Sequence, residues 1–233
     1  MTDTPTVPLS TGLPGDPDRL HLTITCEIGP VLAAGERSQT HRLLARYPQE
    51  RDAAEIRRPP NDGLSQVALL GLCQIPMDSG SVSTALLADL ENTIPRGSEV
   101  ISAVHRDALT NQNDRSEFTT VLRKMLGQGP YGDLGNLLIV NEFTFDDGWD
   151  DPGLGVLLLG ELVARAGSGP CVVATAPKFL NGAQGYQRTL AVLSAAGFRP
   201  LRGHTTIVEP SGLPAFSGPA GTALIRLRRA SGG

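Results

Sequence analysis

"NEFTFDDGWDDPGLGVLLLGELVARAG", residues 141–167, is the stretch that decides the fold. It begins with the pattern of a strand, continues through a turn with two glycines, and ends in an apolar run of helical length closed by Gly167. A strand, a glycine turn and a helix often build a cradle for phosphate, because the first amides of the helix point at the ligand. Four aspartates in the turn oppose an anionic ligand: Asp146, Asp147, Asp150 and Asp151.

The segments on either side of this stretch extend the same alternation of elements. "NLLIVNEFTF", 136–145, and "CVVATAP", 171–177, have the apolar character of strands covered on both faces. "YQRTLAVLSAAGF", 186–198, predicts a helix closed by Gly197, and "HTTIVEP", 204–210, predicts a further strand. The order predicts an α/β fold, a mixed twisted β-sheet flanked by helices on both faces, with its first two strands parallel.

The first 135 residues carry weaker patterns. Residues 1–18 are rich in Pro, Thr, Gly and Asp and predict a disordered tail, and 19–230 predicts a single domain. "LHLTITCEI", 20–28, alternates strictly between apolar and polar residues and predicts a half-buried strand. The remaining expectations are a helix over 36–47, a strand over 64–75, a helix over 81–94, a strand over 99–109, a helix from Asp114 with a capping box at Glu117, and a last strand over 222–229.

Composition excludes several classes of protein. The net charge of −4 gives no general attraction to nucleic acid or to an anionic membrane. The three cysteines are far apart and indicate reduced thiols, and the four histidines form no metal-binding motif, so we expect no metal. The N-terminus lacks the features of an export signal and no apolar stretch has the length of a membrane span. We therefore expect a cytoplasmic protein, and the arginine-rich, alanine-rich and glycine-rich composition indicates a GC-rich bacterium.

Residues 136–209 resemble the acetyl-CoA-binding half of the GNAT acetyltransferase superfamily. That family has a strand, a loop of pattern Arg/Gln-x-x-Gly-x-Gly/Ala, a helix, a second parallel strand, and a helix ending in Gly-Phe. The corresponding loop in this chain runs from Asp150 to Gly155, and the second helix ends at Gly197 and Phe198. The resemblance covers roughly a third of the chain, and residues 19–135 form a divergent N-terminal half.

The resemblance implies an acyl-CoA-dependent N-acyltransferase, in which an amine attacks the thioester of acetyl-CoA or another acyl-CoA directly. The acceptor is then a small-molecule or peptide amine. The strand before the loop pairs with the pantetheine arm, which Phe143, Thr144 and Phe145 would line. The loop amides bind the pyrophosphate, so these residues would face the phosphates: Gly153, Leu154, Gly155 and Val156. Glu142 is the candidate general base, and the alternative is a solvent-facing strand carboxylate.

Two departures from the family keep a second function open. Asp150 stands where the family has an arginine or a glutamine, and the tyrosine that protonates the leaving thiolate is absent from "LAVLSAA", whose one hydroxyl is Ser194. A catalytically inactive GNAT-fold protein that binds a ligand or a partner protein is therefore the alternative. Nucleotide binding of the Rossmann type is weaker, since 171–177 ends without an acidic residue. Exposed strand edges make a homodimer a further expectation.

Overall fold

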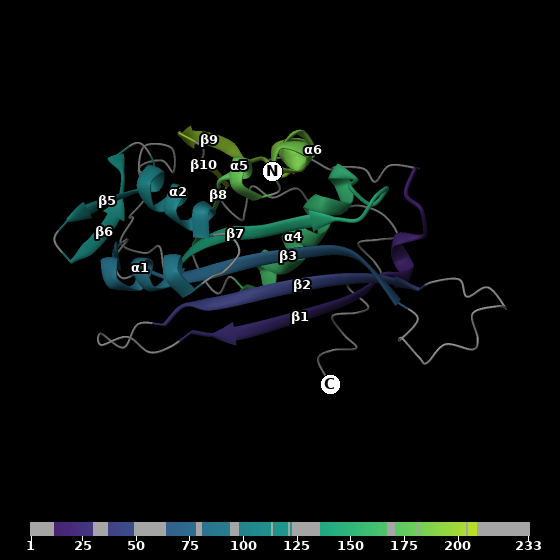
Figure 1. The fold of residues 1–233 in the computed structure, drawn as a ribbon, viewed down its shortest axis with the longest axis horizontal. Helices are drawn as coiled ribbons and strands as arrows, with labels where there is room; N and C mark the ends of the chain where they lie inside the picture. The colour runs from purple at the N-terminus through teal and green to yellow at the C-terminus, as the bar shows by residue number, and fades with distance from the viewer. Residues whose placement is uncertain are drawn as a thin grey trace, which may run out of the picture.

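A twisted sheet forms the centre of the computed structural model, which describes residues 12–29, 37–48, 64–77, 81–93, 98–112, 114–120, 122, 136–166, 171–180, 182–203 and 205–208. Within these residues the sheet has seven strands in the order β1-β2-β3-β7-β8-β10-β9 (Figure 1). The strands are β1 His21–Ile28, β2 Gln39–Pro48, β3 Leu64–Pro76, β7 Asn136–Phe145, β8 Cys171–Thr175, β9 Arg199–Arg202 and β10 Thr205–Val208. Only β7 and β8 pair in parallel; every other neighbouring pair is antiparallel.

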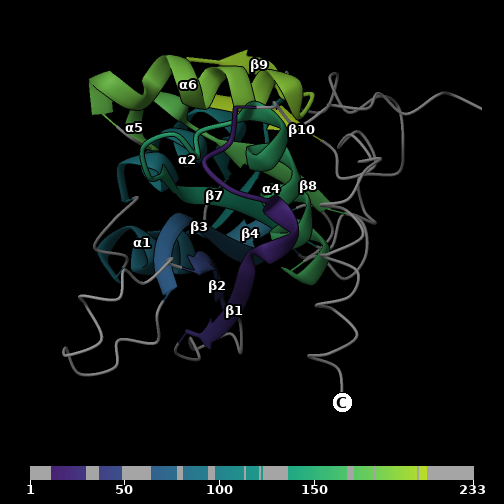
Figure 2. The same cartoon turned by 90° about the vertical axis from the view of Figure 1, so that its right-hand side faces the viewer.

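Helices cover both faces of this sheet, which confirms the α/β expectation. They are α1 Thr84–Thr93, α2 Ser98–Ala108, α4 Pro152–Ala166, α5 Pro177–Leu180 and α6 Gly182–Ala195. Figure 2 shows α1 and α2 on one side of the sheet and α4 on the other. Two buried apolar clusters correspond to the two faces, one holding α4 and the end of α6, and the other holding α1 and α2. A small sheet, β4 Ser81–Ser83, β6 Arg115–Phe118 and β5 Leu109–Gln112, lies beside α1 and α2.

The second half of the chain follows the predicted order of elements. Strand β7, helix α4, strand β8, helix α6 and strand β10 all occur within a few residues of the predicted bounds. Gly197 has a φ of 82°, and the amide of Phe198 donates to the carbonyl of Leu193 at 2.9 Å, so the Gly-Phe pair ends α6 as a C-cap. The short strand β9 was not predicted, and the strand expected over 222–229 lies outside the described residues.

Three predictions in the first half are wrong. The helix expected over 36–47 is the strand β2, in which Leu43 and Ala45 alternate into the core. The strand expected over 99–109 is the helix α2, whose buried residues recur at helical spacing, as in Val100, Val104 and Ala108. The helix expected from Asp114 begins instead as the strand β6, held between β4 and β5.

The segment that begins at Asp114 shows why the local pattern failed. Asp114 does not cap a helix of its own; its backbone carbonyl accepts hydrogen bonds from the amide and the hydroxyl of Thr84, at 3.0 and 2.7 Å. Ser116 and Phe118 are buried at alternate positions, as a strand requires. Tertiary pairing therefore overrides the capping-box signal.

The N-terminal segment is described from Gly12 onward, and residues 1–11 of the expected tail lie outside the described residues. From Gly12 the chain packs on the end of the sheet. The amide of Asp16 donates to the hydroxyl of Tyr47 at 3.1 Å, and the guanidinium of Arg19 lies 5.3 Å from the centre of the Tyr47 ring. A short 3-10 turn, Pro17–Arg19, then leads into β1.

A β-bulge interrupts β7 at Asn141. In the pairing with β3, Gly71 faces Glu142 while Leu72 faces Val140, so Asn141 is the extra residue. The bulge shifts the alternation of side chains: Val140 and Phe143 both point to the α4 face. Strict alternation would have put Phe143 on the opposite face.

Candidate functional site

A pocket opens where the parallel strands β7 and β8 separate. Their pairing runs from Asn136 opposite Cys171 to Ile139 opposite Ala174 and then stops. At that point the hydroxyl of Thr175 donates to the backbone carbonyl of Val140 at 2.8 Å. Beyond it, β7 continues for several residues with β3 on one side and no described strand on the other. The bulge at Asn141 lies at the point of separation. Bulges bend and twist the strand that carries them, so the bulge helps to turn β7 away from β8.

The pocket has a volume of about 250 Å³ and is walled by the end of β7 and by α6. Its lining residues are Phe143, Thr144, Phe145, Asp150, Leu180, Gly185, Arg188, Thr189 and Val192. Phe143 and Phe145 form an edge-to-face pair with ring centres 5.2 Å apart. The three residues predicted to line a pantetheine arm therefore lie together in one wall of this pocket.

Arg188 and Thr189 come from α6 and were not singled out in the sequence. The lining residues of α6 recur at Gly185, Arg188, Thr189 and Val192, which is the spacing of one helix face. That periodicity was the available signal, but the sequence does not show which face turns to β7. Thr144 and Thr189 supply the hydroxyls in the lining, whereas Tyr186 does not belong to it.

The turn between β7 and α4 is closed by one of its own aspartates. Asp151 caps α4: its Oδ1 accepts a hydrogen bond from the amide of Leu154 at 2.8 Å, and its carbonyl accepts one from the amide of Gly155 at 2.9 Å. Pro152, at the first helical position, has no N–H. Two amides of the predicted phosphate cradle are thus engaged within the chain.

The four residues predicted to face phosphates are all buried in α4. Leu154 and Val156 are fully buried members of the core on the α4 face. A Cβ placed on Gly155 would lie 2.6 Å from a methyl group of Val192, so this glycine lets α4 and α6 approach closely. The packing of two helices accounts for Gly155, and phosphate binding by Gly153, Leu154, Gly155 and Val156 stays a prediction.

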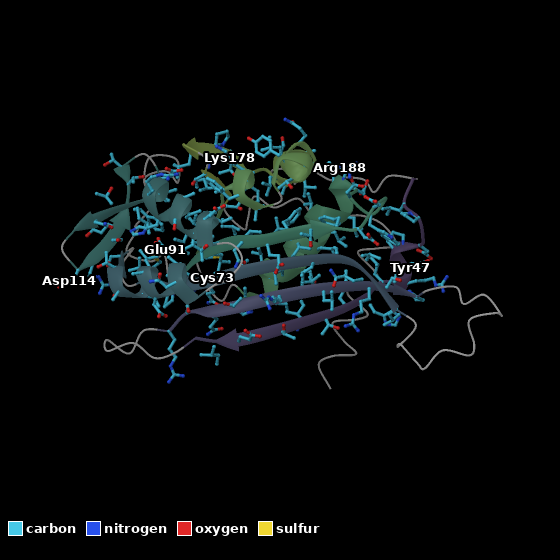
Figure 3. The ribbon with its side chains drawn as sticks, viewed as in Figure 1. Tyr47, Cys73, Glu91, Asp114, Lys178 and Arg188 are labelled. Carbon is cyan, nitrogen blue, oxygen red and sulfur yellow. The ribbon has the colours of Figure 1, made fainter. Side chains whose placement is uncertain are left out.

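Asp150 forms an ion pair across the mouth of the pocket. Its Oδ2 lies 2.8 Å from an Nη of Arg188 on α6, and the two side chains are 26% and 65% exposed. Figure 3 shows Arg188 beside α6, at the end of the molecule where β7 finishes. The carboxylate of Asp150 therefore holds a guanidinium at the mouth of the pocket, and the two charges offset each other.

The other acidic residues of the turn do not enter the pocket lining. Asp146 and Asp147 are exposed to solvent. The amide of Asp146 continues the pairing of β7 by donating to the carbonyl of Val67 at 2.9 Å. Trp149, between the aspartates, is 6% exposed and packs with Tyr47 at 4.9 Å between ring centres, so it supports the turn from below.

Glu142 lies one residue before the pocket lining, on the face opposite α4. Its Oε2 is 3.7 Å from Nε of Arg42 on β2, and its side chain is 11% exposed. The reach spans β3 at Gly71, where a Cβ would lie 2.8 Å from the Cβ of Glu142. Thr144, which shares this face of β7, does line the pocket. Glu142 thus adjoins the pocket lining in sequence, and its side chain reaches across β3 to an ion-pair partner on β2.

Thiols and histidines add no metal centre to this part of the molecule. The described residues contain no cluster of three or more His, Cys, Asp or Glu side chains that could hold an ion. Burial raises the pKa of the Cys73 thiol to about 12 and raises the pKa of Cys171 as well, so both stay protonated. Of the histidines, His204 lies outside the described residues.

Two further polar groupings hold elements together away from the pocket. His41 Nε2 lies 3.0 Å from Gln74 Oε1, and the side-chain Nε2 of Gln74 donates to Oδ1 of Asn136 at 3.0 Å, which links β2, β3 and β7. His105 Nδ1 lies 3.0 Å from Glu91 Oε1, and Nε2 lies 3.0 Å from Asn111 Oδ1, which links α1, α2 and β5. The first grouping is buried, and its side chains satisfy one another as buried polar groups require; the second lies partly exposed at the surface.

No family model, no curated protein and no solved structure matches this chain. Among the helices that the structure describes, none combines the length and the apolar character of a membrane span.

Proposed function

We propose that the protein is an acyl-CoA-dependent N-acyltransferase of GNAT type, and that the pocket between β7 and α6 receives the acyl end of the cosubstrate. The observation that carries the proposal is the separation of β7 from β8 at the pocket. Beyond Val140, the edge of β7 that faces the pocket has backbone groups with no described strand beside them. The amides of a pantetheine arm can pair with such an edge as an added strand would.

The acyl transfer itself requires few groups. The nitrogen of the acceptor amine attacks the thioester carbonyl, a C–N bond forms, the C–S bond breaks, and CoA leaves as the thiolate. Glu142 is the proposed general base for the proton that the amine loses, directly or through water. Its position beside Thr144 supports this role, since both residues lie on the face of β7 away from α4.

The fit of CoA to the turn is weaker than the fit of its arm to the pocket. Asp151 occupies the amide of Leu154, and Pro152 offers none. The guanidinium of Arg188 is the cationic group in the pocket lining and would be the phosphate donor in place of the family's loop residue. Asp150 must then release Arg188 or share it.

The occupied turn favours a second candidate function, a GNAT-fold protein that binds a ligand in the same pocket without acyl transfer. Asp151 supports it, because a carboxylate bound to the helix start competes with a pyrophosphate for the same amide. In this case, pocket ligands are neutral or cationic and α4 stays capped throughout.

Calorimetry and thermal unfolding with acetyl-CoA, CoA, acetyl-pantetheine and NAD separate the two functions. We expect stabilisation by the CoA compounds and none by NAD, followed by release of CoA, measured chromatographically, when amines are added. Stabilisation by the neutral acetyl-pantetheine alone, with no transfer of its acetyl group to a panel of small amines and peptides, supports the second function. No response to any of the thioesters contradicts both the acyl-CoA proposal and the role of the pocket in it.

A further inference from the structure

β1 lies at one edge of the seven-stranded sheet that the described residues form. Within the described part of the chain, β2 pairs with one side of β1 and no strand pairs with the other. Figure 1 shows β1 along the lower rim of the sheet. Edge strands expose N–H and C=O groups to which a further strand can pair, and proteins usually protect them with lysine, proline or bulges. β1 contains neither lysine nor proline, and it pairs with β2 without a register shift.

The sequence of β1, HLTITCEI, is complementary to itself when reversed. In an antiparallel pair of two copies centred on Ile24, each side chain meets a suitable partner on its own face of the sheet. The facing positions are Ile24 with Ile24, Leu22 with Cys26, Thr23 with Thr25, and His21 with Glu27. We propose that two copies of this chain form a homodimer through β1 in this register, which joins the two sheets into one.

The apolar face of β1 gains cover in this arrangement. Leu22 and Ile24 are half-buried against the core of their own protomer, and Cys26 beyond them is exposed. Ile28 is 61% exposed, and within the described residues it is the large apolar side chain that stands out as uncovered. Pairing places the apolar residues of one copy beside those of the other, so solvent is removed from both.

The polar face of the sheet is basic beside the start of β1, where Arg46 lies on β2, and acidic at the end of β1, where Glu27 lies. His21 at the start of the strand has Arg46 directly opposite on β2, whereas Glu27 at the end has the neutral Thr40 opposite. An antiparallel partner brings the basic start of one strand to the acidic end of the other. A parallel partner would set like ends together, so charge selects the antiparallel arrangement.

The extent of the strand and its charges together select the register. Centring the pair on Thr25 instead of Ile24 sets Glu27 against Thr23 and leaves His21 unmatched. Centring it on Thr23 moves Glu27 beyond the strand of the second copy and onto the 3-10 turn at Pro17–Arg19. Of these three centres, only Ile24 sets His21 against Glu27 at both ends with every pair between them inside the strand, and it leaves Ile28 facing Leu20 just before the strand.

Cross-linking tests the register directly. In the dimer, Leu22→Cys faces Cys26 of the second copy, so mild oxidation should give a covalent dimer on a non-reducing gel. Within one chain the two positions are about 13 Å apart along the strand, too far for a disulfide. Thr23→Cys points to the other face of the sheet and is the matched control, which should cross-link no faster than the wild type.

Charge reversal tests the same pair without added thiols. Sedimentation should show a dimer for the wild type, and Glu27→Lys should weaken dimerisation about tenfold, because a cation then replaces the carboxylate in the row that already holds His21 and Arg46. Adding His21→Glu should restore the dimer, since the pair is then reversed. Thermal unfolding of each variant reports whether the monomer is folded.

A wild type that is monomeric at every concentration overturns the proposal. A dimer that neither charge variant affects, or equal cross-linking of Leu22→Cys and Thr23→Cys, overturns it as well, because the interface then lies elsewhere. None of these results depends on binding of acyl-CoA, so the proposal stands apart from the proposed activity.

Discussion

Nε of Arg42 and Oε2 of Glu142 lie 3.7 Å apart, although β3 runs between the strands that carry them. Gly71 occupies the position between them, paired with Arg42 on one side and with Glu142 on the other. Because this glycine has no side chain, the guanidinium and the carboxylate meet above the sheet. The candidate base therefore has its ion-pair partner two strands away.

Glu142→Gln is the direct test of that candidate base. We expect kcat to fall by about 100-fold with little change in the affinity for acetyl-CoA, because general bases typically contribute at that level. Arg42→Gln is the matched control: it removes the ion pair but keeps the carboxylate, and most of the turnover should remain. Steady-state kinetics across pH measure both, and unchanged turnover in Glu142→Gln would remove Glu142 from the mechanism.

Arg188→Ala tests the phosphate donor at the pocket mouth. We expect the affinity for CoA to fall about tenfold or more, since hydrogen bonds to charged groups contribute about 1.5–3 kcal/mol. Acetyl-pantetheine, which lacks phosphate, should bind as it does to the wild type. Calorimetry with the two ligands gives the comparison.

Asp150→Asn is the counterpart of that variant, because it keeps the shape of the side chain and frees Arg188 from its ion pair. We expect CoA to bind more tightly to this variant than to the wild type. If both Arg188→Ala and Asp150→Asn bind CoA with wild-type affinity, the ion pair takes no part in cosubstrate binding.

Asp151 should stabilise the folded protein through the cap that it forms at the start of α4. Asp151→Ala removes the cap on the amide of Leu154 and should lower the free energy of unfolding by about 1 kcal/mol, within a usual range of about 0.5–2 kcal/mol. Asp151→Asn keeps a capping oxygen and should lose much less. Urea unfolding of the two variants measures the difference, and equal losses would show that charge, not the cap, is what stabilises the turn.

Two glycines of α4 make a matched pair for packing. At Gly155 an added methyl group meets Val192 at 2.6 Å, whereas at Gly160 nothing lies within 4 Å. Gly155→Ala should therefore destabilise the protein, because overpacking typically costs about 1–3 kcal/mol and exceeds the gain in helix propensity. Gly160→Ala should stabilise it by up to about 1 kcal/mol. Denaturant unfolding would contradict the packing account if the two changes had the same sign.

Cys73 predicts an alkaline loss of stability. Its pKa is raised from 9.0 to about 12 by burial, so the folded protein keeps a proton that the unfolded chain releases. The contribution is complete below about pH 9 and is lost as pH rises between about 9 and 12, at up to about 1.4 kcal/mol per pH unit. Cys73→Ala should be less stable at pH 8 but should lose stability less steeply above pH 9, as urea titrations at several pH values would show.

The sequence predicted the elements of the second half well because each carries its own local signals. Gly197 and Phe198 end α6, and Asp151 with Pro152 begins α4, as capping rules require. The first half depended on partners instead. β2 has the composition of a helix but lies between β1 and β3, and pairing with both decides its structure.

The sequence predicted the residues of β7 that line the pocket but not those of α6. Phe143, Thr144 and Phe145 follow from their place before the turn. Arg188 and Thr189 lie more than 40 residues further along the chain, and only the packing of α6 on α4 brings them to β7. Gly155 shows the opposite difficulty, since a glycine that resembles part of a phosphate loop is explained here by contact with Val192.

The extra residue at Asn141 divides β7 into two parts with different roles. Before Asn141, β7 is a central strand of the sheet, buried between two layers of helices. After Asn141 the alternation of its side chains is shifted by one residue, and the strand lines the pocket. Deleting Asn141 would leave Glu142 and Phe143 on their present faces, because Val140 opposite Leu72 would then be followed directly by Glu142 opposite Gly71. Regular pairing through a retained Asn141 would instead turn Glu142 towards the apolar layer under α4 and Phe143 away from it. β7 can therefore lose a residue at Asn141 without moving the side chains that follow it, whereas a deletion elsewhere in the strand would turn those side chains to the other face.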